Sequence, residues 1–294
     1  MNEPTNILVF GMGRRIRDDL IPALTLIGLD KFNLYFMKKK PIKESWQKSF
    51  HVAGGFEELL FAGTFDFIFI CVPPNEVAGC FELVKKLNFN GTLLIDTPIT
   101  SFCEKFGRAL EDQSFDIRVL EDNGLVQFAE MIRSDKFKFR IIVNWRALFD
   151  YHGISFFKSV TDERLRVRFN FKFGRFRFLL LTTSKTIVLS ITPYNYSKGE
   201  IYFFDFNGGR RCFSLKTLNF YFLQCLGNHS FISKMRMESR LMKHSHKFSS
   251  NAVSQMNCWK RLALYDALSS LFFSQENVFP TIQDSLKNEI PFRP

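Results

Sequence analysis

Cysteine and histidine are scarce in this chain of 294 residues, and neither is spaced as a metal site requires. The six cysteines form no Cys-x-x-Cys pair, so they predict reduced, mostly buried thiols rather than a zinc cluster or a disulfide framework. Of the five histidines only His244 and His246 are close together, in a polar stretch typical of a solvated loop. We therefore expect no metal site and a cytoplasmic location.

Long hydrophobic runs are also missing. No stretch approaches the roughly 20 apolar residues that a membrane-spanning helix needs. The polar start MNEPTN and the short apolar run after it predict no signal peptide. A membrane span is therefore not expected.

Basic residues and phenylalanine are abundant instead. The formal net charge is +11, 37 residues are phenylalanine, and the hydrophobic content of 46% is that of a globular protein. Such basicity suits a nucleic acid, an anionic membrane surface or an acidic small-molecule substrate. Composition alone does not separate these partners.

Residues 6–24 carry the first functional motif. The apolar run Ile7–Phe10 is followed by Gly11-Met12-Gly13 and then by apolar residues at helical spacing. A strand, a glycine turn and a helix N-terminus form the start of a dinucleotide-binding unit, in which backbone N–H groups receive a pyrophosphate. The third glycine of the fingerprint is absent, because Ile16 stands in its place.

A second strand is expected at residues 32–37, and it leads into Lys38-Lys39-Lys40. NAD-binding domains usually have an acidic residue here that binds the ribose diol. Lysines would instead attract a 2′-phosphate, which favours NADP over NAD. A solvated lysine run is the alternative.

The next segments alternate between strands and helices. An almost continuous apolar run at 65–72 ends at Pro73-Pro74-Asn75, a helical pattern follows at 76–87, and another strand at 92–95 ends at Asp96-Thr97-Pro98. Apolar strands of this kind are typical of parallel sheets covered by helices on both faces. We predict an α/β fold with an N-terminal doubly wound Rossmann sheet.

Three of these segments resemble the Gfo/Idh/MocA oxidoreductases, the family of glucose-fructose oxidoreductase and inositol dehydrogenase. They are GMGRRIRDDLIPAL at 11–24, FDFIFICVPPNEV at 65–77 and GTLLIDTP at 91–98, in the family's order. The resemblance implies a nicotinamide cofactor and a sugar-like substrate. Its cofactor residues would be those of the phosphate loop, the lysine run and the two strand ends, namely Gly11, Met12, Gly13, Arg14, Arg15, Lys38, Lys39, Val72, Pro73, Asn75 and Pro98.

The implied catalytic residues depart from the family pattern. Family Glu-Lys-Pro is Asp96-Thr97-Pro98 here, so Thr97 replaces the lysine that lies beside the reacting hydroxyl. His152 matches the family histidine, whereas Ser155 stands where the family has aspartate. Histidine is a suitable general base near neutral pH, with Thr97 and Asp96 orienting the substrate. A core histidine without a catalytic role is the alternative for His152.

The second half of the chain predicts an α+β domain with a largely antiparallel sheet. Strands are expected at 138–145, 164–181, 186–192 and 200–206, and helical patterns at 216–227 and 252–273. In 164–181 basic residues alternate with apolar ones, which predicts one basic, solvated face and one buried face. A phosphate platform for nucleic acid is the disfavoured alternative.

We therefore expect a Rossmann domain at 1–121 and a substrate or oligomerisation domain at 122–294, whose tail packs back on the first domain. The predicted function is NAD(P)-dependent hydride transfer on a sugar or sugar nucleotide, in a pathway such as polysaccharide biosynthesis. The alternative is a catalytically degenerate Rossmann-type sensor or assembly protein. Association of copies through the second-domain sheet is left open.

Overall fold

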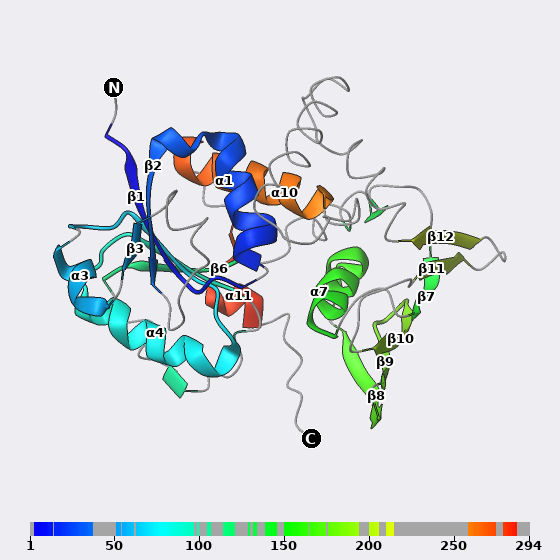
Figure 1. Cartoon of the computed structure of the whole chain (residues 1–294). Helices are drawn as coiled ribbons and strands as arrows, with labels where there is room; N and C mark the ends of the chain where they lie inside the picture. Colours follow the sequence, from blue (N-terminus) through cyan, green and yellow to red (C-terminus); the bar gives the residue numbers. More distant parts are fainter. Residues whose placement is uncertain are drawn as a thin grey trace. The chain divides into compact units, whose positions relative to one another are not determined.

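The computed structural model describes residues 3–13, 15–37, 51–53, 55–61, 63–96, 99, 105–106, 114–120, 129, 132–133, 139–145, 150–163, 165–174, 176–193, 200–205, 210–214, 258–274 and 279–286. The chain divides into two compact units (Figure 1). The first contains residues 1–121, 243–252 and 264–286, and the second contains residues 122–242, 253–263 and 287–294.

The first unit is built on a parallel six-stranded sheet with the order β3-β2-β1-β4-β5-β6. Its strands are β1 (Thr5–Phe10), β2 (Phe32–Met37), β3 (His51–Ala53), β4 (Phe67–Ile70), β5 (Thr92–Asp96) and β6 (Asp116–Leu120). This is the strand order of a dinucleotide-binding Rossmann sheet. The predicted N-terminal fold is confirmed.

Helices and turns connect these strands, and they are η1 (Arg15–Leu20), α1 (Ile21–Ile27), η2 (Leu29–Lys31), α3 (Phe56–Phe61) and α4 (Pro74–Lys86). In α4, Pro74 occupies the first turn and Lys85 and Lys86 the last, which suits proline's fixed φ and the helix dipole. Apolar side chains at alternate positions of the strands pack into two separate cores, one on each face of the sheet.

The C-terminal elements of the first unit are the second half of α10 (Cys258–Ser269), η5 (Ser270–Ser274) and α11 (Ile282–Leu286). Leu268 and Phe279 are buried in the same core as β1 and α1. The carbonyl of Pro280 accepts a hydrogen bond of 3.0 Å from the backbone N–H of Val119 in β6. Residues 264–286 therefore extend the first unit beyond its last strand.

The second unit contains a six-stranded sheet with the order β12-β11-β7-β10-β9-β8 and the helix α7 (Asp150–Thr161). The strands are β7 (Phe139–Trp145), β8 (Arg166–Phe173), β9 (Phe176–Thr182), β10 (Ile187–Pro193), β11 (Glu200–Asp205) and β12 (Arg210–Ser214). All neighbours are antiparallel except β7 and β10, which are parallel. The predicted α+β architecture is confirmed.

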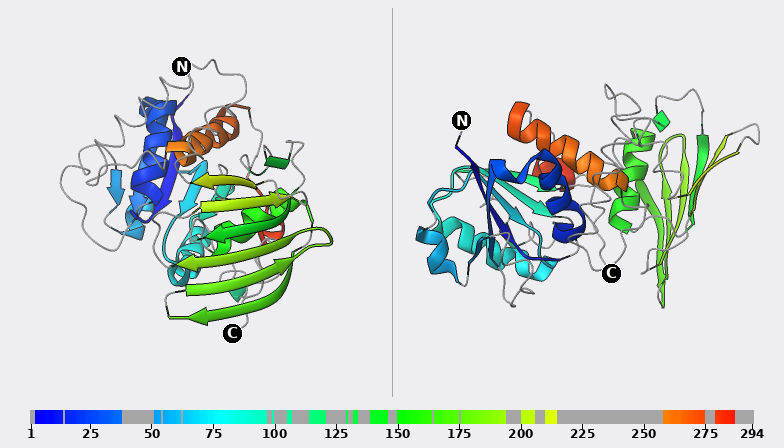
Figure 2. Two further views of the ribbon diagram at one scale, coloured as in Figure 1. Left: turned by 90° about the vertical axis from the view of Figure 1, so that its right-hand side faces the viewer. Right: turned by 45° about the horizontal axis from the view of Figure 1, so that its top comes forward.

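One face of this sheet lies against α7 (Figure 2). Phe156 and Phe157 of the helix are buried, as are Leu181 of β9 and Val188 of β10 on the inner face. The predicted helical segment at 216–227 lies outside the described residues.

The prediction of a buried apolar face along β8 was wrong. Every residue of β8 is exposed, and Phe169, Phe171 and Phe173 are 53%, 49% and 69% exposed. These rings are stacked along the strand, with centroids 6.1 and 6.4 Å apart. Because β8 is the edge strand of the sheet, alternation along it does not by itself create a covered face.

Candidate functional site

Three strand ends meet at the carboxyl edge of the first sheet. The pairs Phe10 with Ile70 and Ile70 with Ile95 place the ends of β1, β4 and β5 at one level. From β1 the chain adds β2 and β3 on one side of the sheet and then β4, β5 and β6 on the other. Ligands of doubly wound sheets bind at the point where this direction reverses, between β1 and β4. The predicted Gly11–Gly13 loop and the Asp96 end of β5 therefore share one edge.

Gly11 is required by the backbone. Its φ is +102°, and a Cβ placed on it would lie 2.5 Å from the carbonyl oxygen of Cys71. Its N–H donates a 3.1 Å hydrogen bond to the carbonyl of Met37, at the end of β2. Only glycine fits this turn without strain.

Gly13 has the opposite surroundings. It is exposed, and among the described residues no atom beyond its immediate neighbours lies within 4 Å of where its Cβ would be. Its carbonyl accepts a hydrogen bond from the N–H of Arg17, so helical hydrogen bonding begins here. A helix start without a side chain at this position is typical of sites where an anion approaches the first N–H groups of a helix.

Ile16, which replaces the third glycine, is fully buried in the core beside β1 and α1. It lies in η1, a π-helical turn that precedes α1. π-Helical turns are uncommon and are frequent at functional sites. The side chain of Ile16 therefore packs into the core, and it does not block the exposed side of the loop at Gly13.

Charged side chains gather beside the loop. Nη1 of Arg15 lies 3.2 Å from Oδ2 of Asp19, and Nε of Arg15 lies 3.7 Å from Oδ1 of Asp96. The three side chains are only 19%, 13% and 24% exposed. Arg15 thus connects the start of the first helix to the end of β5.

Cys71, the residue after β4, is buried near this charged group. Burial raises the pKa of its thiol well above the usual value, and the negative charge of Asp96 raises it further. The positive charge of Arg15 lowers the same pKa, and Asp19 raises it. The thiol therefore stays protonated near neutral pH and is not a nucleophile there.

The remaining predicted cofactor residues are partly visible. Met12 packs against the core, Val72 is half-buried, Pro73 is the N-cap of α4, and Asn75 is exposed in its first turn. Others lie outside the described residues, namely Arg14, Lys38, Lys39, Thr97 and Pro98.

His152 lies in the first turn of α7, in the second unit, and its side chain is outside the description. Its role as general base, and its meeting with Asp96 and Thr97, stay predictions.

The sequence interpretation missed Asp19, Arg17 and Cys71. The Arg15–Asp19 pair had a signal, because residues four apart share a helix face. No sequence pattern singled out Arg17. Its Nε is buried and has no hydrogen-bond partner among the residues that the structure describes.

Among the described residues no group of histidine, cysteine or acidic side chains is placed to hold a metal ion. Within the same part of the chain no helix has the length and apolar character needed to cross a membrane.

The sequence matches no protein-family model and no curated protein. The structure is similar to GenD2 from gentamicin A biosynthesis in complex with NAD, with 10% identity, 98% of this chain and 92% of that chain covered, and a TM-score of 0.60. It is similar to scyllo-inositol dehydrogenase from Lactobacillus casei with bound NAD(H) and scyllo-inositol, with 10% identity, coverage of 97% and 94%, and a TM-score of 0.57. An oxidoreductase from Sinorhizobium meliloti has 11% identity, coverage of 98% and 95%, and a TM-score of 0.59.

These similarities extend over nearly the whole chain and include both sheets. The resemblance to Gfo/Idh/MocA oxidoreductases is therefore confirmed at the level of the fold, in a divergent sequence.

Proposed function

We propose that this protein is an NAD(P)-dependent oxidoreductase that transfers hydride between the nicotinamide and a sugar-like or sugar-nucleotide substrate. The observation that carries the proposal is the Gly11–Gly13 loop. It combines a glycine that no side chain can replace with an open glycine at a helix start, at the ligand-binding edge of a Rossmann sheet.

The residues at this edge fit a dinucleotide. The open space at Gly13 admits a pyrophosphate to the first N–H groups of η1, and Arg17 adds a cation whose buried Nε lacks a partner among the described residues. Lys38 and Lys39 would bind a 2′-phosphate, which is why NADP is preferred in this proposal. The nicotinamide, when bound, supplies the hydride acceptor or donor.

The chain's own residues would then handle the substrate. Val72, Pro73 and Asn75 would support the nicotinamide half of the cofactor. His152 would accept the proton of the reacting hydroxyl, while Thr97 and Asp96 would orient that hydroxyl. The solved neighbours GenD2 and scyllo-inositol dehydrogenase support the choice of a nicotinamide cofactor, because NAD is bound in the first and NAD(H) in the second. A cytoplasmic, polysaccharide-forming pathway is the setting we propose.

A second candidate is a sensor or assembly protein that binds the cofactor without turnover. It is favoured by Thr97 in place of lysine and Ser155 in place of aspartate. A threonine hydroxyl can orient a substrate but supplies no positive charge.

The test is binding followed by turnover. NADH and NADPH are titrated into the full chain by tryptophan fluorescence, and reduction of NAD and NADP is then followed with scyllo-inositol and a panel of sugar nucleotides. Turnover that falls at least about a hundredfold in His152→Ala, with cofactor affinity kept, is the expected result for a general base. Binding without turnover across the panel supports the sensor, and absence of binding contradicts both.

A further inference from the structure

Arg15 makes contacts that a simple phosphate ligand would not need. It is the first residue of η1, and its guanidinium lies between Asp19 on the same helix and Asp96 at the end of β5. The distance to Asp19 spans one helical turn, whereas the contact with Asp96 joins residues 81 positions apart in the chain. The second contact therefore ties the cofactor loop to the strand end that carries a predicted substrate residue.

The surroundings make this arrangement stronger than an ordinary surface ion pair. None of the three side chains is more than a quarter exposed. Partly buried pairs are less screened by salt and water than exposed pairs. Of these three side chains one is a guanidinium and two are carboxylates, so the charge of Arg15 is already engaged by carboxylates and is less available to a further anion.

The buried thiol of Cys71 provides a second observation of the same cluster. The charges of Asp96, Arg15 and Asp19 all shift the pKa of this thiol, so the three side chains lie near the residue that follows β4. The cluster of Arg15, Asp19 and Asp96 thus lies where the ends of β1, β4 and β5 meet, beside the glycine loop.

We propose that Arg15 is a positioning residue that holds the Asp96 carboxylate in place, and that it is not a ligand of the cofactor phosphate. This inference rests on the proposed function, since Asp96 is there a substrate-orienting group. Arg15 fixes the distance between the loop that receives the cofactor and the strand end that faces the substrate. Phosphate binding is left to the helix N–H groups and to other cations.

The first test uses the folded chain without any ligand. The carboxyl ¹³C signal of Asp96 is assigned by its loss in Asp96→Asn, and it is then recorded in Arg15→Gln. We expect Arg15→Gln to shift that signal, and Arg118→Gln to leave it in place. Arg118 is the matched control, because it pairs at 2.9 Å with Asp116 at the opposite end of the same sheet. An unmoved Asp96 signal in Arg15→Gln overturns the proposal.

The second test separates positioning from phosphate binding. In Arg15→Gln we expect the Kd for NADH or NADPH, whichever binds wild type more tightly, to stay within about threefold of wild type, while loss of a charged phosphate contact would raise it about tenfold or more. A tenfold rise overturns the proposal. Arg17→Gln is the matched variant on the same helical turn, and because Arg17 is the cation proposed for the pyrophosphate, its Kd for the dinucleotide should show that rise.

The third test applies to the turnover found in the substrate panel. Arg15→Gln and Asp96→Asn should each lower kcat, and the double variant should be no slower than the slower single variant. Arg15→Lys should restore only part of kcat, because lysine keeps the charge without the planar fork. Effects that multiply in the double variant overturn the proposal. If neither NADH nor NADPH binds wild type, the proposed function fails, whereas the ¹³C measurement still decides whether Arg15 holds Asp96.

Discussion

Gly11 and Gly13 are two residues apart and differ in what a side chain would meet. At Gly11 the φ of +102° and the Cys71 carbonyl at 2.5 Å both exclude a Cβ, whereas at Gly13 a Cβ would meet no atom of the described residues within 4 Å. We expect Gly11→Ala to lower the free energy of unfolding by about 2–5 kcal/mol, from backbone strain and overpacking. Gly13→Ala should change it by less than about 0.5 kcal/mol.

Urea denaturation followed by circular dichroism measures both values. The matched pair separates structure from function, because Gly13→Ala should weaken cofactor binding without weakening the fold. Equal loss of stability in the two variants would contradict the assignment of their roles.

The thiol of Cys71 reports on the charges around it. Asp96→Asn removes a negative charge that raises the pKa of this thiol, so the thiolate fraction at a pH below the pKa should increase. Arg15→Gln removes a positive charge that lowers the same pKa, so the thiolate fraction should decrease. The two substitutions should therefore change alkylation in opposite directions.

Iodoacetamide labelling read by peptide mass spectrometry measures this effect, with Cys80 of the same chain as internal reference. Faster labelling of Cys71 in both variants would mean that the substitutions open the structure, and would contradict the electrostatic explanation.

At the same scale, the sequence was informative where a residue's role is local. The Gly11 turn was predicted from the glycine motif, and the Arg15–Asp19 pair, which was not predicted, also follows from a rule that operates within a few residues. The Arg15–Asp96 contact depends on how β1, β4 and β5 are ordered in the sheet, which no local pattern contains.

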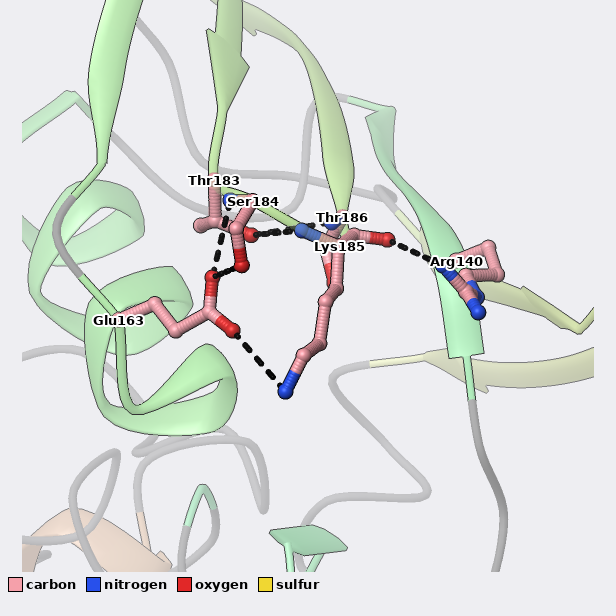
Figure 3. Close-up of polar contacts among 6 residues, drawn as sticks. All are labelled: Arg140, Glu163, Thr183, Ser184, Lys185 and Thr186. Atoms are coloured by element: carbon pink, nitrogen blue, oxygen red, sulfur yellow. Dashed lines mark hydrogen bonds and ion pairs between the residues drawn. The ribbon is translucent and has the colours of Figure 1, made fainter.

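At the scale of secondary-structure elements, the turn between β9 and β10 is stabilised by hydrogen bonds to the side chain of Glu163, which lies outside the turn (Figure 3). Glu163, just after α7, accepts hydrogen bonds from the backbone N–H of Ser184 at 2.9 Å and from its hydroxyl at 2.7 Å. The hydroxyl of Thr183 accepts hydrogen bonds from the N–H groups of Lys185 and Thr186. The carboxylate of Glu163 thus links the end of the α7 segment to the tip of the sheet.

This contact should make stability depend on pH. Hydrogen bonds from Ser184 and Thr183 lower the pKa of Glu163 below its usual value. A lowered pKa contributes stability that is present above the unfolded value, about 4.3, and is lost as the pH falls through the folded value.

We therefore expect Glu163→Gln to lower the denaturation midpoint at pH 7, and the difference from wild type to vanish once the carboxyl is protonated. Midpoints recorded from pH 7 down to the acid limit of folding measure this difference. Glu82→Gln, at an exposed ion pair with Lys85 in α4, is the control for loss of a surface carboxylate. A difference that is independent of pH would contradict the role given to Glu163.

Periodicity predicted most strands but not the environment of their faces. The alternation in residues 166–173 correctly indicated a strand, yet both of its faces are exposed. Period two assigns residues to two faces, and only the neighbouring elements decide which face is covered. Likewise, apolar spacing predicted a helix after the glycine loop, but not that its first turn is π-helical.

At the scale of the whole molecule, the outer face of the second sheet is an unusually apolar surface. Exposed apolar side chains come from four adjacent strands, and they are Ile141, Phe169, Phe171, Phe173, Phe176, Ile187 and Leu189. Large apolar patches of this kind are typical of protein–protein interfaces. We propose that two copies of the chain associate through this face.

Sedimentation velocity tests this proposal. Wild type is expected to sediment as a dimer or larger assembly, and Phe171→Lys together with Leu189→Lys should shift it to the monomer. Lys172→Ala is the control, because Lys172 alternates with Phe171 and Phe173 along β8 and so lies on the other face of the strand; it should leave the assembly unchanged. A monomeric wild type at micromolar concentration would contradict the proposed interface.

The central claim is that the Gly11–Gly13 edge of the Rossmann sheet binds a nicotinamide dinucleotide. Isothermal titration of the full chain with NADH and with NADPH tests it most directly. The account predicts one saturable site per chain for at least one of the two, with a Kd between about 1 µM and 1 mM, weakened in Gly13→Ala. No saturable binding of either dinucleotide to the folded wild-type chain, up to millimolar concentration, would contradict it.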